Sequence, residues 1–499
     1  SPAYRAPFST DEALADADMV ASLTADRARS SVLYRNGNDA PDHLRMKVYS
    51  RGRPMPLSER VPLFEAMGFR VISEDTFEIT PENGVETSLH DMVLARARPG
   101  PLDMTALKPQ IEALMAARFR GDVESDGYDA LTLEAGIGWR DVAMIRALSR
   151  YLQQARIGFS QDYMWTTLAA YPAIARKLVD LFYVRFDPRM FDDMASRERT
   201  EKAVAAEIET MLADVASLDQ DRILRRFLNL VQAAERTNYF QIEEDGSTPK
   251  VISFKFESRK IANLPLPKPL FEIFLYSPRV EGVHLRFGKV ARGGIRWSDR
   301  PQDFRTEILG LVKAQQVKNA VIVPVGAKGG FVPKLAPPPS QRDAWMAEGV
   351  AAYKIFIDAL LDITDDLHGD DVVAPERVVR HDPDDPYLVV AADKGTATFS
   401  DTANAISREH GFWLDDAFAS GGPAGYDHKK MGITARGAWE AVKRRFREMD
   451  RDIQTNAFSC VGVGDMSGDV FGNGMLLSKE TRLVAAFDHR DIFLDPDPD

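Results

Sequence analysis

The chain has 499 residues, of which 44% are hydrophobic and 28% charged, and its formal net charge at pH 7 is −12. This length exceeds one ordinary hydrophobic core, so we expect three or four domains in a globular protein. The acidic balance argues against a nucleic-acid-binding protein, because phosphate backbones select basic surfaces. It leaves room for a local basic pocket that binds a small dicarboxylate.

The cysteine content and the N-terminus indicate the cellular context. A single cysteine, Cys460, allows no intrachain disulfide and fits a reducing compartment. No stretch approaches the roughly 20 uninterrupted apolar residues of a membrane span, and residues 1–4 show no signal-peptide pattern. We therefore expect a cytoplasmic protein that binds no membrane. The absence of an initiator methionine suggests a piece of a longer protein.

The first 100 residues predict a small regulatory α/β module with an N-terminal extension. Residues 1–38 give little periodic signal, whereas Leu44, Met46 and Val48 alternate with their neighbours as in a strand. A helical segment and two strand-like runs follow at residues 61–67, 69–72 and 92–95. This β-α-β-β order favours a small α/β sandwich.

Residues 101–245 predict a helical region that serves packing and linkage. Two apolar stripes have the spacing of buried helix faces. They consist of Ile145, Leu148 and Leu152, and of Ile174, Leu178, Leu181 and Phe182. The second helix should end at Asp187-Pro188, because proline disfavours helical geometry in the preceding residue.

Residues 246–424 predict an α/β domain with an unusual concentration of cations. Strand-like runs occur at residues 252–256, 272–276 and 283–287. Next comes Arg292-Gly293-Gly294-Ile295-Arg296, where the glycine pair predicts a tight turn that projects both guanidinium groups to one place. Arginine binds carboxylates through two parallel hydrogen bonds, so we expect an anionic ligand here.

A lysine and an aspartate complete this constellation. Residues 321–325 predict a strand that leads into Gly326-Ala327-Lys328-Gly329-Gly330, where the small neighbours should let a substrate reach the amine. Residues 387–392 predict a second buried strand, ending at Asp393, and ligands of α/β proteins lie at such strand ends. The alternatives are solvated surface cations for the lysine and a helix N-cap for the aspartate.

The C-terminal residues, 425–499, predict the start of a nucleotide-binding domain. A helix at 435–448 and a strand at 458–461 precede the glycine loop Gly462-Val-Gly464-Asp465-Met-Ser-Gly468. A helix at 470–477 and a strand at 483–487 follow, ending at Asp488, 26 residues after Gly462. An acid there can hydrogen-bond the ribose hydroxyls and favours NAD over NADP; Asp491 is a rival for this role.

The predicted nucleotide-binding domain stops after two strands. Half of such a domain cannot cover a dinucleotide, so we expect the isolated 499-residue chain to be inactive and to bind no NAD.

In their order and in their amino-acid sequence, these motifs resemble the large bacterial type of NAD-specific glutamate dehydrogenase, over roughly residues 40–499. The motifs that carry the resemblance lie at residues 292–305, 317–320, 326–330, 393–396, 433–437 and 462–472. Two further segments of similar sequence lie at 221–227 and 236–240. The resemblance implies an ACT-like module, a helical region, an α/β substrate domain of the amino-acid dehydrogenase type and an incomplete Rossmann domain. It also implies that the full-length protein is a homo-oligomer.

The resemblance further implies amino-acid catabolism: oxidative deamination of L-glutamate to 2-oxoglutarate and ammonia, with NAD as the hydride acceptor and no metal. Lys328 would polarise the substrate carbonyl and activate water, and Asp393 would shuttle the proton of the amino group. Substrate carboxylates would bind Lys318, Arg292 and Arg296. The implied cofactor-binding residues are Thr434 at the nicotinamide amide, and Gly462, Gly464, Asp465, Gly468 and Asp488.

Two departures from the family pattern weaken parts of this assignment. Lys318 and Lys328 are ten residues apart, two fewer than in the small enzymes of the family. Arg292 stands where those enzymes usually have a lysine that grips the side-chain carboxylate. A dehydrogenase for branched-chain amino acids remains an alternative, in which the side-chain pocket is apolar and Arg292 is idle. A non-catalytic regulatory or scaffold fragment is another, because residues 43–97 look like an effector module and the nucleotide-binding domain is incomplete.

Overall fold

The computed structural model describes residue 4 and residues 8–81, 84–315, 325–393, 395–396, 398–420, 431–463, 469–488 and 490–498. Contacts divide the chain into two compact units, Ser1–Phe418 and Ala419–Asp499. None of the described helices is both long and apolar enough to cross a membrane.

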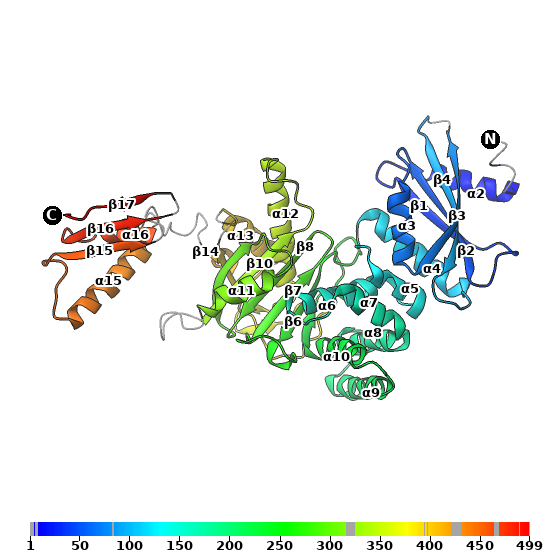
Figure 1. Ribbon diagram of the computed structural model, residues 1–499. Helices are drawn as coiled ribbons and strands as arrows, with labels where there is room; N and C mark the ends of the chain where they lie inside the picture. Colours follow the sequence, from blue (N-terminus) through cyan, green and yellow to red (C-terminus); the bar gives the residue numbers. More distant parts are fainter. Residues whose placement is uncertain are drawn as a thin grey trace. The chain divides into compact units, whose positions relative to one another are not determined.

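The first unit begins with a four-stranded antiparallel sheet in the order β1-β2-β4-β3, drawn in blue in Figure 1. Its elements are α2 (Thr10–Ala21), β1 (Arg29–Tyr34), β2 (His43–Arg51), α3 (Leu57–Ala66), β3 (Phe69–Ile79) and β4 (Thr87–Arg96). The predicted β-α-β-β order is confirmed from β2 onward. Residues 1–38, which gave little periodic signal, in fact contribute α2 and β1. Strand β1 lacks a clear alternation because only Ser30 and Leu33 are buried in it.

A helical block follows, as the apolar stripes predicted. It contains α4 (Met104–Arg120), η1 (Gly127–Asp129), α5 (Ala130–Ala135), α6 (Trp139–Gln154), α7 (Gln161–Ala170), α8 (Pro172–Phe186), α9 (Met194–Leu212) and α10 (Leu218–Ala233). Both predicted stripes are buried, and α8 ends at Phe186, immediately before Asp187-Pro188. One continuous core extends from Leu33 through this block to Val332, so the N-terminal sheet and the helices pack as one body.

The block packs on a mixed sheet, whose strands in this unit run in the order β13-β9-β10-β8-β7-β6-β5. Its strands are β5 (Ala234–Thr237), β6 (Ile252–Glu257), β7 (Phe271–Tyr276), β8 (Val280–Arg286), β9 (Ala291–Trp297), β10 (Val325–Pro333) and β13 (Val389–Ala392). The strands β13, β9 and β10 are parallel, and β10 pairs antiparallel with β8. The parallel strands therefore end at one edge of the sheet.

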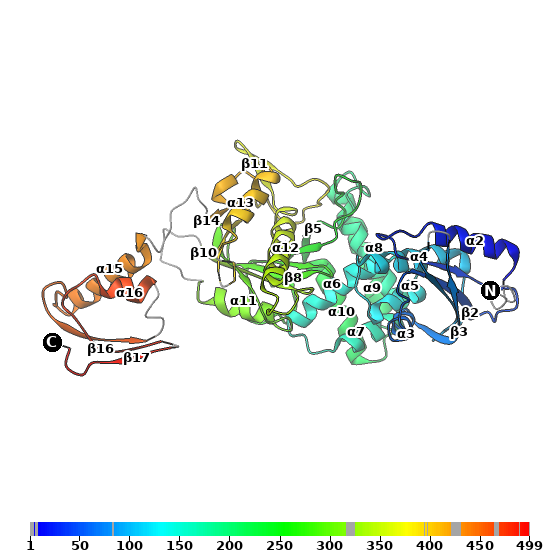
Figure 2. The same cartoon turned by 90° about the horizontal axis from the view of Figure 1, so that it is seen from above.

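Two helices, α11 (Phe304–Lys313) and α12 (Arg342–Leu361), cover opposite faces of this sheet (Figures 1 and 2). Gly330 of β10 lies against Ile308 of α11, and its neighbour Gly329 lies against Phe356 of α12. Successive strand residues face opposite sides of a sheet, which places the two helices on different faces. The remaining elements of the unit are η2 (Ser258–Lys260), β11 (Asp366–His368), β12 (Asp371–Val373), α13 (Ser400–Glu409) and η4 (Asp415–Ala417).

The second unit contains the βαβ arrangement predicted for a nucleotide-binding domain. Its elements are β14 (Ala419–Ser420), α15 (Ile433–Glu448), β15 (Phe458–Val463), α16 (Asp469–Met475), β16 (Thr481–Phe487) and β17 (Ile492–Leu494). Strands β15 and β16 are parallel, as expected, whereas β17 was not predicted and pairs antiparallel with β16. Trp439, Ile453 and Phe458 form its small core.

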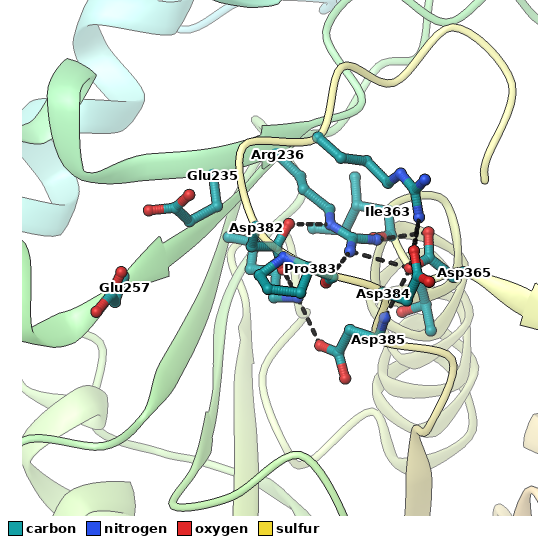
Figure 3. A network of polar contacts seen from close by, with 12 residues as sticks. Glu235, Arg236, Glu257, Ile363, Asp365, Asp382, Pro383, Asp384 and Asp385 are labelled. Carbon is teal, nitrogen blue, oxygen red and sulfur yellow. Dashed lines mark hydrogen bonds and ion pairs between the residues drawn. The ribbon is translucent and has the colours of Figure 1, made fainter. Parts of the chain in front are cut away.

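A buried network of charges holds the segment that leads into β13 (Figure 3). Arg236 of β5 is fully buried and donates to the carboxylates of Asp365 and Asp382, at 2.6–3.0 Å, and to the carbonyls of Ile363 and Pro383. Asp382 also accepts from Lys255 of β6. The guanidinium therefore has a partner for every donor, as a buried arginine requires.

The same segment is tied to β8 one step further along. Asp385 accepts from Lys255 and from Arg286, and Arg286 also donates to the carbonyl oxygen of Tyr387 at 2.8 Å. The chain between Asp382 and Tyr387 is thus held against β5, β6 and β8 just before it enters β13. The position of the residue that follows β13 depends on this anchor.

Replacing Arg236 with alanine should lower the free energy of unfolding of this chain by about 3–5 kcal/mol, because it removes the buried cation that Asp365 and Asp382 share and leaves them only Arg380 and Lys255. The matched control is Arg225→Ala, which removes exposed ion pairs with Glu209 and Asp221 and should cost less than about 1 kcal/mol. Urea denaturation measures both. Equal losses for the two variants would contradict the role of the network.

Candidate active site

The glycine pair of β9 lies inside the strand, so the predicted turn at Gly293-Gly294 is wrong. A side chain at Gly293 would overlap the carbonyl oxygen of Ala327 in β10, and a Cβ at Gly294 would lie 2.8 Å from the carbonyl oxygen of Ala392 in β13. The glycines are needed because neighbouring strands approach β9 closely from both sides. This close approach brings the interior of β10 near the end of β13.

Arg292 and Arg296 still point to one side of the sheet, for a different reason from the predicted turn. They are four residues apart in a strand, and side chains at even spacing share a face. Arg292 is exposed, whereas the Arg296 side chain is 19% exposed and hydrogen-bonded. The two arginines therefore differ in their availability to a ligand.

Lys328 is an interior residue of β10, so the glycine-rich run that was predicted to follow a strand is itself part of a strand; residues 321–324 of the predicted strand lie outside the described residues. The space beside its glycine neighbours is taken by protein: a Cβ at Gly326 would meet Gln315, and a Cβ at Gly329 would lie 2.5 Å from Ile295. Lys328 itself is 7% exposed. The strand register, with Gly326 beside Arg292 and Gly329 beside Ile295, places it level with Gly294.

Asp393 directly follows β13, at the edge where the parallel strands end, and forms an ion pair with the amine of Lys328. The two residues that the sequence singled out, 65 positions apart, are thus in contact. An amine and a carboxylate in contact at a largely buried position can pass a proton between themselves and a third group.

The turn after Asp393 is held by its own side chains and by β9. Thr396 is buried, its hydroxyl donates to the carbonyl oxygen of Ile295 at 2.6 Å and accepts from the backbone N–H of Asp393 at 3.0 Å. Gly395 has a φ of 85°, which favours glycine, and lies against Trp297. The carboxylate is therefore held by backbone geometry as well as by charge.

Arg296 forms the second charged contact of Asp393. Its guanidinium lies 3.4 and 3.5 Å from the two carboxylate oxygens and donates to Glu307 of α11 at 3.0 Å. Burial disfavours the charged guanidinium, but the hydrogen bonds to Glu307 and Asp393 outweigh it and raise the pKa of Arg296. Glu307 was not anticipated from the sequence, where it reads as an ordinary polar position of an amphipathic helix.

His284 of β8 is a second residue that sequence reasoning missed. It pairs with Gly329, next to Lys328, and is 1% exposed. Neither ring nitrogen has a hydrogen-bond partner among the described residues. Burial and the nearby Arg286 lower the pKa of His284 to about 3, so the imidazole is neutral at pH 7.

Several predicted site residues are not part of this cluster. Lys318, Gly464, Asp465 and Gly468 lie outside the described residues. In the second unit, Gly462 is buried near the end of β15 and Thr434 is exposed on α15. Asp488 follows β16, and its carboxylate accepts from the backbone N–H groups of Arg490 and Asp491. Its rival Asp491 thus contributes its backbone to the same turn.

Three family models match consecutive parts of the chain. The model of the bacterial NAD-glutamate dehydrogenase catalytic domain matches residues 207–499, which is more than half of the chain. The chain belongs to the bacterial NAD-glutamate dehydrogenase family. Models of the glutamate dehydrogenase ACT3 domain and of helical motif 3 match residues 30–107 and 123–188. The expected family is thereby confirmed, and with it an α/β chain that contains an ACT3 domain.

Curated members of this family cover almost the whole chain. It is 51% identical to the NAD-specific glutamate dehydrogenase of Halomonas elongata over 99% of its length, and 50% identical to that of Mycobacterium tuberculosis over 100%. These matches span 30% and 31% of the relatives, so the chain corresponds to about a third of the full-length glutamate dehydrogenases.

The chain is also similar to a solved structure of hetero-hexameric glutamate dehydrogenase from Thermus thermophilus in a leucine-bound form. The identity is 17% and the TM-score 0.30, over 55% of this chain and 58% of that one.

Because of its buried histidines, the protein should have a lower free energy of unfolding in acid. Burial lowers the pKa of His284 to about 3 and, together with Arg185, that of His381 to about 4. An unfolded imidazole titrates near 6.5, so below about pH 6.5 the unfolded state binds more protons and stability falls as pH falls. The variant His284→Leu should flatten this dependence by up to about 1.4 kcal/mol per pH unit.

The measurement is urea denaturation between pH 7 and pH 4. His368→Leu is the matched control, because this imidazole is 68% exposed, and it should change the slope less than His284→Leu does. If His284→Leu kept the wild-type slope, His284 would not be a buried neutral imidazole.

Proposed function

We propose that this chain forms part of an NAD-dependent glutamate dehydrogenase that converts L-glutamate to 2-oxoglutarate and ammonia. The observation that carries the proposal is the contact of Lys328, inside β10, with Asp393, which directly follows β13, in a member of this family. Oxidative deamination requires proton transfers at nitrogen and oxygen and the attack of water on one carbon. A paired amine and carboxylate can supply both.

Asp393 would take a proton from the ammonium group of glutamate, so that the amino nitrogen can form a double bond to Cα. Lys328 would release its own proton to solvent once Asp393 is protonated, and its neutral amine would then take a proton from water as the oxygen bonds to Cα of the iminium intermediate. Asp393 would return its proton to the nitrogen, and its carboxylate would then take the hydroxyl proton as the carbonyl forms, the C–N bond breaks and ammonia leaves. The ion pair between the two groups keeps both within reach of the same atoms.

The substrate carboxylates would be bound by cations of the same region. We assign the α-carboxylate to Lys318 and the side-chain carboxylate to Arg292, whose exposed guanidinium lies on β9 on the same face as Arg296. A dicarboxylate needs two such cations, whereas the side chain of a branched-chain amino acid needs none. For this reason glutamate is preferred over leucine as the proposed substrate.

The second unit would hold NAD, which supplies the acceptor for the hydride of Cα. Its parallel β15 and β16, with Gly462 buried in β15 and Asp488 just after β16, fit the adenosine side of a dinucleotide. Asp488 would bind the ribose hydroxyls, and Gly464, Asp465 and Gly468 the diphosphate. We assign Thr434 to the nicotinamide amide.

The proposed domain boundaries follow from this assignment. Residues 1–100 would form an ACT-like regulatory module and 101–245 a helical linker region. Residues 246–424 would form the substrate domain and 425–499 the start of the NAD-binding domain. We propose that the full-length enzyme is a homo-oligomer.

Replacing Lys328 with alanine in the full-length enzyme should lower kcat by at least about 10²–10⁴-fold, because the general base is lost. The matched control is Lys354→Ala, at an exposed position of α12, which should keep wild-type activity. Formation of NADH at saturating L-glutamate measures both. Near-normal turnover of Lys328→Ala would contradict the proposed chemistry.

Substrate choice tests the assignment of the cations separately. The wild-type enzyme should oxidise L-glutamate with a kcat/KM at least about 100-fold above that for L-leucine, because only glutamate pairs with the second cation. Arg292→Met should raise the KM for glutamate and reduce this preference. A wild-type enzyme that favours leucine would instead support the branched-chain alternative.

A further inference from the structure

Arg296 is shared by two carboxylates, and the closer one is not Asp393. Its shortest contact is the 3.0 Å hydrogen bond to Glu307, whereas both distances to Asp393 lie at 3.4–3.5 Å, beyond the usual range of a strong N–H···O bond. An unopposed arginine and aspartate would form a close bidentate pair. Glu307 therefore holds the guanidinium away from Asp393.

Glu307 is itself firmly placed. Its other carboxylate oxygen accepts from the hydroxyl of Ser298 at 2.6 Å, and its side chain is 14% exposed. Two residues earlier on α11, Arg305 forms a buried bidentate pair with Glu272 of β7, whose carboxylate also accepts from Tyr151 of α6. The helix that carries Glu307 is thus fixed to the sheet and to the helical block.

We propose that Glu307 is a positioning residue for the Lys328–Asp393 pair: by retaining Arg296, it keeps the Asp393 carboxylate oriented but available for proton transfer. The inference rests on the proposed function. Neither Glu307 nor Arg296 contacts the reacting atoms in this account, so Arg296 orients Asp393 and does not bind the substrate, in contrast to the role that the family resemblance implies for it.

The charges around Asp393 determine whether replacing Glu307 favours or opposes the loss of a proton from Asp393 and Lys328. Among the described residues, the charged groups that face it are Lys328 from β10 and Arg296 from β9, with Glu307 of α11 behind Arg296. With two cations and two anions, this cluster is neutral overall. Replacing Glu307 with glutamine leaves one excess positive charge and frees Arg296 to move closer to Asp393. Both changes favour the loss of a proton from Asp393 and from Lys328.

The test is the pH dependence of glutamate oxidation by the full-length wild-type enzyme and its Glu307→Gln variant. We expect the acidic limb of the kcat profile to move by about one pH unit toward lower pH. The plateau kcat should fall about tenfold, because a weaker base accepts the proton less readily. The KM for L-glutamate should change less than about twofold, because the substitution removes no contact with the bound substrate.

Two further variants separate positioning from a merely structural role. Glu307→Asp keeps the charge but shortens the reach, and should give a smaller shift of the same limb with partial recovery of kcat. Asp343→Asn, a matched loss of charge at an exposed position of α12, should leave the profile unchanged. If Glu307→Gln does not fold, the shift of the acidic limb in Glu307→Asp tests the inference in its place.

An unchanged acidic limb would overturn the inference, whether activity is retained or lost. A large increase in KM with an unmoved limb would also overturn it, and would assign Arg296 to the substrate carboxylate. A wild-type enzyme that does not oxidise glutamate would instead refute the proposed function itself.

Discussion

The ion pair between Lys328 and Asp393 is the contact on which the candidate active site depends. Lys328 is 7% exposed, and a buried ammonium group is stable only with a close partner. The partner follows a different strand, β13, so the end of β13 must lie level with the interior of β10 across β9. Gly293 and Gly294 make this possible, because any side chain there would push β10 or β13 away from β9.

A second set of buried charges supports this pair from a distance. The chain leading into β13 carries Asp382 and Asp385, which are held by Arg236, Lys255 and Arg286. Such networks add little net stability over apolar packing, but they admit few alternative arrangements. These buried ion pairs thus fix the segment that ends at Asp393. On the other side of the site, Arg305 and Glu272 fix α11 in the same way.

The sequence predicted these elements best where one strong pattern acts locally. The helix stripes of the helical block, the β-α-β-β order and the parallel strands flanking the glycine loop were all found in this way. So was the position of Asp393, because a buried run followed by an acid and a glycine marks the end of a strand. Strand β1 was not predicted, because its burial depends on packing against α4 and produces no alternation of apolar and polar residues in the sequence.

The glycines of the site were misread for a related reason. A glycine pair indicates either a turn or a close approach of backbones, and only the neighbouring strands decide between them. Glu307 was missed because its partners, Arg296 and Ser298, meet it only through the packing of α11 on the sheet, and His284 because its imidazole has no hydrogen-bond partner among the described residues. The family resemblance supplied roles for Lys328 and Asp393, but their mutual contact, and its link through Arg296 to Glu307, required the structure.

The most direct test of the account is a double-mutant cycle on Lys328 and Asp393 in the full-length enzyme. The variants Lys328→Ala, Asp393→Asn and the double mutant are compared with wild type by the rate of NADH formation from L-glutamate. Residues that act as one unit give strongly non-additive losses, so the double mutant should be no slower than the slower single mutant. Losses that multiply, as for two independent residues, would contradict a shared catalytic role of the pair.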